Sequence, residues 1–310
     1  MPKWFKLWPL LLGLLSSACA APEQCVVERV ADLALTRTRD FALLPSRLDD
    51  ADARLLLDTG AGATMLSCAI ADRLALMPDN KMFPSPVNGI GGVTLTRRMV
   101  VESFRIGALD LGKQSVMVTE PGLFSGFDPA PDGIVGGDFL SQFDADIDLA
   151  ANRLTLYRAH PCAAAFAPPW PGATIYRLPA RMTDGGQFLI PVTVNGVTIT
   201  AMIDSGAQTS AISTGAESRL GLTPAMLARD PQRTEIGIDM HRRPAYLHQF
   251  HAIRIGAETF PDSAVWVSDM PLVPADMLLG ADFFQTHRVW LSFSRRLVFV
   301  AVAGGGAGSF

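Results

Sequence analysis

The sequence lacks the features of a nucleic-acid-binding protein, a disulfide-rich scaffold or a membrane-spanning protein. Only 18% of its 310 residues are charged, with 26 Lys and Arg against 30 Asp and Glu and no basic run, so no nucleic-acid partner is expected. Four cysteines are too few for a disulfide scaffold. After residue 21, no stretch of 18 uncharged apolar residues could form a spanning helix.

The sequence is rich in apolar residues and in residues that make turns. Apolar side chains account for 49% of the chain, which provides for a core and excludes a disordered chain. The 27 Gly and 22 Pro favour short strands joined by turns. A length of 310 residues allows two ordinary domains.

Residues 1–20 have the composition of an export signal. Lys3 and Lys6 form a positive start, residues 7–15 are apolar, and small residues follow. The apolar run is too short to span a bilayer, so it indicates a secretory signal peptide. We therefore expect an exported protein.

Two cleavage sites fit this segment. Ala18-Cys19-Ala20 matches the Ala-x-Ala pattern, which would leave Ala21 as the first residue. The alternative is a bacterial lipoprotein signal cut before a lipidated Cys19, although its usual Leu lies at Leu15 and not three residues before the cysteine. A lipid on Cys19 is the only membrane attachment that we expect.

Export also affects the remaining cysteines, because an oxidising compartment permits disulfides. Cys25 and Cys162 lie just outside the repeated segments described next, whereas Cys68 lies in an apolar stretch. We expect a Cys25–Cys162 disulfide and a buried free Cys68. Three unpaired thiols are the alternative.

The chain contains an internal duplication. Asp-Thr-Gly-Ala at 58–61 recurs as Asp-Ser-Gly-Ala at 204–207, and an apolar-Gly-x-Asp-Phe sequence ends at Phe139 in one copy and Phe283 in the other. The interval from first to last Asp is 80 residues in one copy (58 to 138) and 78 in the other (204 to 282). Matched landmarks in the same order predict two copies of one structural unit.

The duplication sets the expected domain boundaries. A Pro-rich segment at 161–172 separates the copies and is unsuited to a helix or a central strand. We expect an N-terminal lobe at 23–160, a linker at 161–172, a C-terminal lobe at 173–303 and a flexible Gly-rich tail at 304–310.

Within each copy the pattern favours strands. Residues 188–203 predict two strands around an Asn195-Gly196 turn, which is a strong hairpin signal. The pattern Asp146-Ile-Asp148 alternates and predicts a strand with both carboxylates facing solvent. Short helices are expected only near 69–76, 217–222, and just after Asp138 and Asp282. The fold class is therefore all-β with short helices.

Asp58 and Asp204 are the candidate catalytic residues. Each follows an apolar strand and precedes a hydroxyl residue and a glycine, so a tight turn delivers a carboxyl into apolar surroundings. If the copies pack about a pseudo-twofold axis, the two carboxyls face each other and share one proton. Such a pair suits hydrolysis, in which one member activates water and the other polarises a carbonyl group.

The two Asp-Thr/Ser-Gly-Ala motifs and the glycine sequences downstream of them resemble those of retropepsin-like and pepsin-like aspartic proteases. The chain is most similar to the bacterial, exported aspartyl protease family proteins, over about residues 30–157 and 174–302. The resemblance implies two β-barrel lobes related by a pseudo-twofold axis, a location in the periplasm or cell envelope, and no cofactor.

The resemblance also implies roles for the residues around the two aspartates. The residues with implied support roles in the active-site loops are Thr59, Gly60, Thr64, Ser205, Gly206 and Ser210. Those at the tips of two flaps over the substrate are Gly89, Ile90, Gly91, Ile236, Gly237 and Ile238. Apolar flap tips suggest hydrophobic side chains on both sides of the scissile bond.

Other chemistries have weaker support. His248 and His251 would point to opposite faces of a strand, so we expect no metal site. Asp138 and Asp282 are interpreted as helix caps or surface acids. The Ser205 sequence lacks the Gly-x-Ser-x-Gly context of a serine nucleophile.

The sequence thus predicts a monomeric aspartic endopeptidase that cleaves extended polypeptides in a cleft between its lobes. A catalytically inactive binding or regulatory protein of the cell envelope, built on the same fold, is the alternative.

Overall fold

The structure is a computed structural model of the 310-residue chain. It describes residues 25, 27–38, 41–80, 83, 85–89, 92–119, 121–124, 127, 129–160, 166–236 and 241–303. Several expectations fall outside these residues and stay predictions: the export segment 1–20 with Cys19, the tail 304–310, Cys162, Ile90, Gly91, Gly237 and Ile238.

The N-terminal half forms a sheet that curls into a barrel. Its strands lie in the order β2, β3, β4, β10, β5, β9, β8 and β6, with β7 paired to β8, and a further pairing of β3 with β8 brings distant strands together. The bounds are β2 (Thr36–Thr38), β3 (Phe41–Leu48), β4 (Ala51–Leu57), β5 (Met65–Leu66), β6 (Met77–Pro78), β7 (Ser85–Gly89), β8 (Gly92–Ile106), β9 (Leu109–Thr119) and β10 (Gly133–Val135).

The C-terminal half repeats this arrangement with eight strands in place of nine. Its order is β14, β15, β16, β21, β17, β20, β19 and β18, with β15 also paired to β19. The bounds are β14 (Arg181–Met182), β15 (Phe188–Val194), β16 (Val197–Ile203), β17 (Ala211–Ser213), β18 (Gln232–Ile236), β19 (Arg242–Ile255), β20 (Glu258–Ser268) and β21 (Met277–Leu279). The predicted fold class, two duplicated β-barrel lobes, is confirmed.

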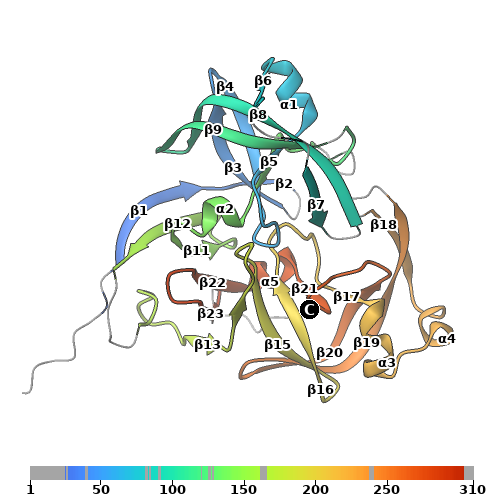
Figure 1. The fold of residues 1–310 in the computed structure, drawn as a ribbon. Helices are drawn as coiled ribbons and strands as arrows, with labels where there is room; N and C mark the ends of the chain where they lie inside the picture. Colours follow the sequence, from blue (N-terminus) through green and yellow to red (C-terminus); the bar gives the residue numbers. More distant parts are fainter. Residues whose placement is uncertain are drawn as a thin grey trace, which may run out of the picture.

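The two halves share a third sheet. Its order is β1 (Val27–Ala34), β12 (Arg153–Ala159), β11 (Asp144–Asp148), β22 (His287–Ser292), β23 (Leu297–Val302) and β13 (Tyr176–Leu178). The first three strands come from the N-terminal half and the last three from the C-terminal half, so the pseudo-twofold axis passes between β11 and β22. In Figure 1 these strands lie on the left side of the view, from β1 down to β13, with the other strands of both halves above them or to their right.

Helices are short and lie at the ends of strands. They are α1 (Cys68–Arg73), α2 (Gly137–Leu140), the 3-10 turn η1 (Thr214–Ala216), α3 (Glu217–Leu220), α4 (Pro224–Leu227) and α5 (Ala281–Thr286). The sequence prediction missed α4, although Thr223 caps it and Pro224 occupies its first position. No helix in the described part of the chain is long and apolar enough to cross a membrane.

The hairpin predicted around Asn195-Gly196 is confirmed. Strands β15 and β16 pair from Leu189↔Met202 to Val194↔Val197. Asn195 and Gly196 both have positive φ, 47° and 86°, as a two-residue turn between twisted strands requires.

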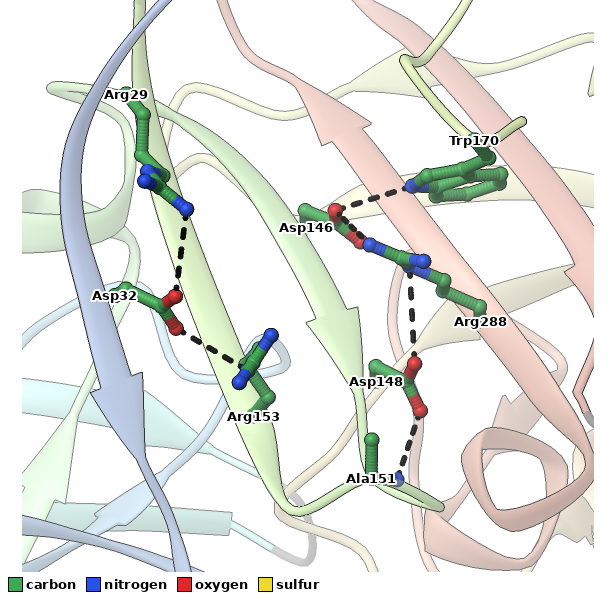
Figure 2. Close-up of polar contacts among 8 residues, drawn as sticks. All are labelled: Arg29, Asp32, Asp146, Asp148, Ala151, Arg153, Trp170 and Arg288. Carbon is green, nitrogen blue, oxygen red and sulfur yellow. Dashed lines mark hydrogen bonds and ion pairs between the residues drawn. The ribbon is translucent and has the colours of Figure 1, made fainter.

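The prediction that Asp146 faces solvent is wrong. The Asp146 side chain is only 1% exposed and accepts two hydrogen bonds from Arg288, at 2.8 and 2.6 Å, and one from Trp170 Nε1 at 3.0 Å. The reason is the shared sheet, in which Asp146 pairs with Trp290 across the boundary between the halves. The C-terminal half therefore covers the Asp146 side chain. Asp148 is 20% exposed and lies at the edge of this cluster, 3.8 Å from Arg288 (Figure 2).

The described end of the predicted linker packs against this sheet. Trp170 is buried, and its ring lies edge-on to Trp290, 6.3 Å between centroids. Phe166 contacts the same ring at 5.4 Å. Phe166 and Trp170 therefore belong to the core that joins the halves, whereas residues 171–172 are exposed.

Replacing Asp146 by Ala is expected to lower the free energy of unfolding by about 3–5 kcal/mol, because the Arg288 guanidinium and the Trp170 N–H would lose their buried acceptor. Urea unfolding of the purified protein measures this loss. The matched control is Asp32→Ala, an acid of the same sheet that is 36% exposed and paired with Arg29 and Arg153 (Figure 2). An equal effect of the two substitutions would contradict the assignment.

Candidate active site

Two matched strand ends carry Asp58 and Asp204. The last residues of β4 and β16 are buried, so each strand leads from the core of the molecule directly to its Asp. The Asp58 backbone N–H donates to Val135 O at 3.1 Å, and that of Asp204 donates to Leu279 O at 2.9 Å. The parallel neighbours β10 and β21 therefore hold the two strand ends in the same way.

The turn after each strand fixes the carboxyl group. Asp58 Oδ1 accepts the backbone N–H groups of Gly60 and Ala61 at 3.0 and 2.8 Å. Asp204 Oδ1 accepts those of Gly206 and Ala207 at 2.9 and 3.1 Å. With one oxygen engaged by its own turn, each carboxyl has a fixed orientation.

The two carboxyl groups lie against the opposite turn. A Cβ atom at Gly60 would overlap the carboxyl of Asp204, and one at Gly206 would overlap the carboxyl of Asp58. Any side chain at either glycine would occupy the space of a carboxyl. The glycines are therefore required by this close approach, and the carboxyls are within hydrogen-bonding reach of each other.

The shared environment changes the acidity of both groups. Burial raises the pKa of Asp204 well above its ordinary value, and the negative charge of Asp58 raises it further. Burial also raises the pKa of Asp58, against the two backbone donors and the hydrogen bond to Asp204, which lower it. The pair therefore retains one proton at a pH at which an isolated Asp has lost it, and it titrates as a unit.

Thr59 and Ser205 link the two turns reciprocally. Thr59 Oγ1 donates to Ile203 O at 2.8 Å and accepts from Ser205 N at 3.0 Å. Ser205 Oγ donates to Leu57 O at 2.7 Å and accepts from Thr59 N at 3.2 Å. Each hydroxyl thus satisfies two buried backbone groups of the other half, which fixes the distance between the carboxyls.

Thr64 and Ser210 connect each loop to the helix behind it. Thr64 Oγ1 donates to Asp138 Oδ1 at 2.6 Å and accepts from Gly136 N at 3.2 Å. In the other half, Ser210 Oγ donates to Asp282 Oδ1 at 2.7 Å and accepts from Gly280 N at 3.0 Å.

The interpretation of Asp138 and Asp282 as helix caps or surface acids was therefore incomplete. Each lies in the first turn of its helix and accepts its neighbour's backbone N–H, but each also holds the active-site loop through the backbone and side chain of Thr64 or Ser210. Burial raises the pKa of Asp282. Their matched positions, at the end of the motif interval in each copy, were visible in the duplication but carried no sign of this contact.

A cleft opens over the two carboxyls. It has a volume of about 500 Å³ and is lined by Asp58, Asp204 and residues of both halves. Ile236, one of the predicted flap-tip residues, lines it, as does Val87 of β7. Gly89 ends β7, where that strand turns toward β8.

No group of His, Cys, Asp and Glu side chains able to hold a metal ion occurs among the described residues. His248 Nδ1 lies 2.7 Å from Asp230 Oδ2, in an ion pair remote from the two aspartates in the chain. Cys25 is disulfide-bonded. Cys68 has a free thiol as expected, but it is half-buried, so the expectation that it is buried is wrong. Because Cys162 lies outside the described residues, the Cys25–Cys162 pairing stays a prediction.

Comparison with known proteins gives one result. A sequence model of the family described as aspartyl protease matches the chain twice, over residues 44–139 and 190–283. The first match contains Asp58 and the second contains Asp204. A search of curated proteins found no match.

Replacing Ser205 by Ala is expected to destabilise the protein by about 1–3 kcal/mol for each of the two backbone groups, Leu57 O and Thr59 N, that lose a buried partner. Chemical denaturation measures this effect. The control Ser294→Ala removes an exposed hydroxyl and should cost less than about 0.5 kcal/mol. A Ser205→Ala variant as stable as the control would contradict the interlock.

The raised pKa of Asp204 predicts a pH-dependent stability. A carboxyl whose pKa is higher in the folded state stabilises the fold at low pH, and this contribution is lost as the pH rises through the folded-state pKa. Asp204→Asn should therefore be more stable than the wild type at pH 7, and the difference should shrink toward pH 4. Thermal unfolding at several pH values tests this, with Asp262→Asn, an exposed acid, as the control. A constant difference across the pH range would contradict the assignment.

Proposed function

Because the chain belongs to the aspartyl protease family, we propose that it is an aspartic endopeptidase in which Asp58 and Asp204 are the catalytic residues. The observation that carries the proposal is a pair of carboxyls, within hydrogen-bonding reach of each other, that retains one proton at the floor of a cleft. A pair with one proton can act as base and acid in the same step.

The chemistry follows from the two protonation states. The ionised carboxyl takes a proton from a water molecule, whose oxygen attacks the carbonyl carbon of the scissile peptide bond. The protonated carboxyl gives its proton to the carbonyl oxygen. The C–N bond then breaks as the nitrogen takes the proton from the carboxyl that activated the water. A hydroxyl of the tetrahedral intermediate returns its proton to the other carboxyl as the C=O bond reforms, so the pair again holds one proton.

The surrounding contacts support this role. The turn N–H groups hold one oxygen of each carboxyl, and the reciprocal Thr59 and Ser205 bonds keep the two groups at a fixed separation. Such fixed geometry lowers the cost of reorganisation during reaction. The edge strands β7 and β18 lead toward the predicted flap tips, so an extended peptide could lie beneath them.

We also propose that the chain acts as an exported monomer. The 1–20 segment supports export, to the periplasm or cell envelope, with a lipid on Cys19 as one form of attachment. The monomer is supported by the covalent duplication, since one chain supplies both carboxyls.

Asp58→Asn and Asp204→Asn should each lower peptidase activity by about 10³-fold or more, because either change removes the acid–base pair. Digestion of a broad peptide library between pH 4 and pH 7 measures the activity, with Asp148→Asn as a control outside the cleft. Inhibition by a pepstatin-type compound should accompany it. Unchanged activity in both Asn variants would exclude this mechanism, and selective peptide binding without cleavage by the wild type would favour the inactive binding protein.

A further inference from the structure

The strand registers allow the two walls of the cleft to be compared position by position. Leu43 pairs with Leu56 as Leu189 pairs with Met202, and Met65 pairs with Ile134 as Ala211 pairs with Leu278. These equivalences follow the pseudo-twofold axis. All of these positions are apolar, although Leu189 and Met202 do not themselves line the cleft. The N-terminal wall has the larger Met65 where the C-terminal wall has Ala211.

The N-terminal wall is extended by three phenylalanines. Phe41 and Phe127 lie 4.6 Å apart between ring centroids, and Phe124 lies 6.0 Å from Phe127. Two of them come from a longer loop. Between the equivalent residues Thr119 and Asp132 there are 12 positions (120 to 131), against 7 between Ser268 and Asp276 (269 to 275).

The third phenylalanine has a polar counterpart. Phe41 lies two residues before Leu43, where the other half has Gln187 two residues before Leu189. Gln187 Nε2 donates to Gly60 O at 3.3 Å and lies at the boundary of the halves. The aromatic subsite therefore exists on one side of the cleft alone among the described residues.

The C-terminal wall contains a charged pair instead. Arg233 of β18 donates to Glu235 Oε1 through Nε at 2.9 Å and through Nη2, and Nη2 also donates to Thr209 Oγ1 at 2.7 Å. The guanidinium lies 3.9 Å from the centre of the Trp266 ring. Five residues after its Asp, the N-terminal half has Ala63 in place of Thr209, so this contact has no equivalent there.

One atom of this pair is left without a partner. Glu235 is 12% exposed at its side chain and lines the cleft, yet Glu235 Oε2 is buried with no hydrogen-bond donor in the described part of the chain. A buried carboxylate oxygen without a donor is costly, and a donor brought by a ligand would relieve that cost.

From these observations, and on the basis of the proposed function, we propose that the cleft is selective in a directional way. The N-terminal wall takes one large apolar or aromatic side chain. The C-terminal wall takes a neutral side chain that carries an N–H or O–H donor, such as Gln or Asn, and pairs it with Glu235. This revises the expectation, based on the flap tips, of hydrophobic side chains on both sides of the scissile bond.

The geometry of an extended peptide assigns the two preferences to neighbouring residues. Successive side chains of a strand point to opposite faces, so the residues before and after the scissile bond meet opposite walls. Net charge selects a neutral donor: Arg233 would repel a cationic side chain, and Glu235 would repel an anionic one. An aliphatic side chain would leave Glu235 Oε2 unpaired.

The test compares peptides that carry Phe next to Gln, Leu, Lys or Glu at the scissile bond, in both orders. In one of the two orders of these residues across the scissile bond, the wild type should cleave the Phe/Gln peptide with a kcat/KM about 10-fold above that of Phe/Leu. This is the gain expected for one recovered hydrogen bond. Phe/Lys and Phe/Glu should be poorer than Phe/Gln. Equal or greater kcat/KM for Phe/Leu in both orders overturns the proposal.

Two variants separate the walls. Arg233→Met with Glu235→Leu removes both charges together, so that neither is left unpaired, and should change the preference from Gln to Leu while the preference for Phe stays. Phe124→Ala should weaken the preference for Phe over Ala about 10-fold while the preference for Gln stays. An unchanged Gln preference in the double variant overturns the proposal.

Binding distinguishes this proposal from the proposed function. The Asp58→Asn variant, titrated calorimetrically with the same peptides, should bind Phe/Gln more tightly than Phe/Leu. If the wild type cleaves nothing but this order of affinities is found, the endopeptidase is wrong and the directional cleft stands. If the wild type cleaves peptides but shows no preference for Phe/Gln, the directional cleft is wrong and the endopeptidase stands. No selective binding and no cleavage overturn both.

Discussion

Two carboxyl groups that are held together in buried surroundings cannot both be charged, and the rest of the molecule depends on meeting that constraint. The pair retains one proton only while Asp58 and Asp204 stay in reach of each other. No residue with a side chain could therefore replace either turn glycine, Gly60 or Gly206. The Thr59 and Ser205 hydroxyls then act as the two crosslinks that set the separation.

The shared sheet also maintains the separation between Asp58 and Asp204. Strands β11 and β22 pair directly across the pseudo-twofold axis, and buried acids of β11 are neutralised by the other half. Asp146 binds Arg288, and Asp144 binds Ser292 at 2.7 Å and Arg295 at 3.2 Å. The duplicated strands are thus equivalent in backbone, but the polar contacts across the axis are not symmetric, which fits a chain whose two copies have diverged.

Much of the architecture could be predicted because it has a local or repeated signal. The duplication, the hairpin at Asn195-Gly196 and the two-lobe fold follow from motif order, turn chemistry and the family resemblance. The burial of Asp146 could not be predicted, since alternation along a strand does not reveal that a second half covers its polar face. The contact of Asp138 with its loop could not be predicted either, because it joins residues far apart in the chain. The Arg233–Glu235 pair was missed because its role depends on the shape of the cleft.

The order of the shared sheet has a consequence for synthesis of the chain. Strands β22 and β23, which complete the C-terminal side of that sheet, are the last ones in the sequence, at 287–292 and 297–302. The reciprocal hydroxyl contacts also need both turns. A growing polypeptide therefore contains both Asp turns once residues 204–207 have been made, but it lacks the strands that complete the shared sheet until nearly its whole length has been made. The shared sheet can therefore bring the two turns to their final separation only late in synthesis, and a chain that stops short of β22 lacks that support.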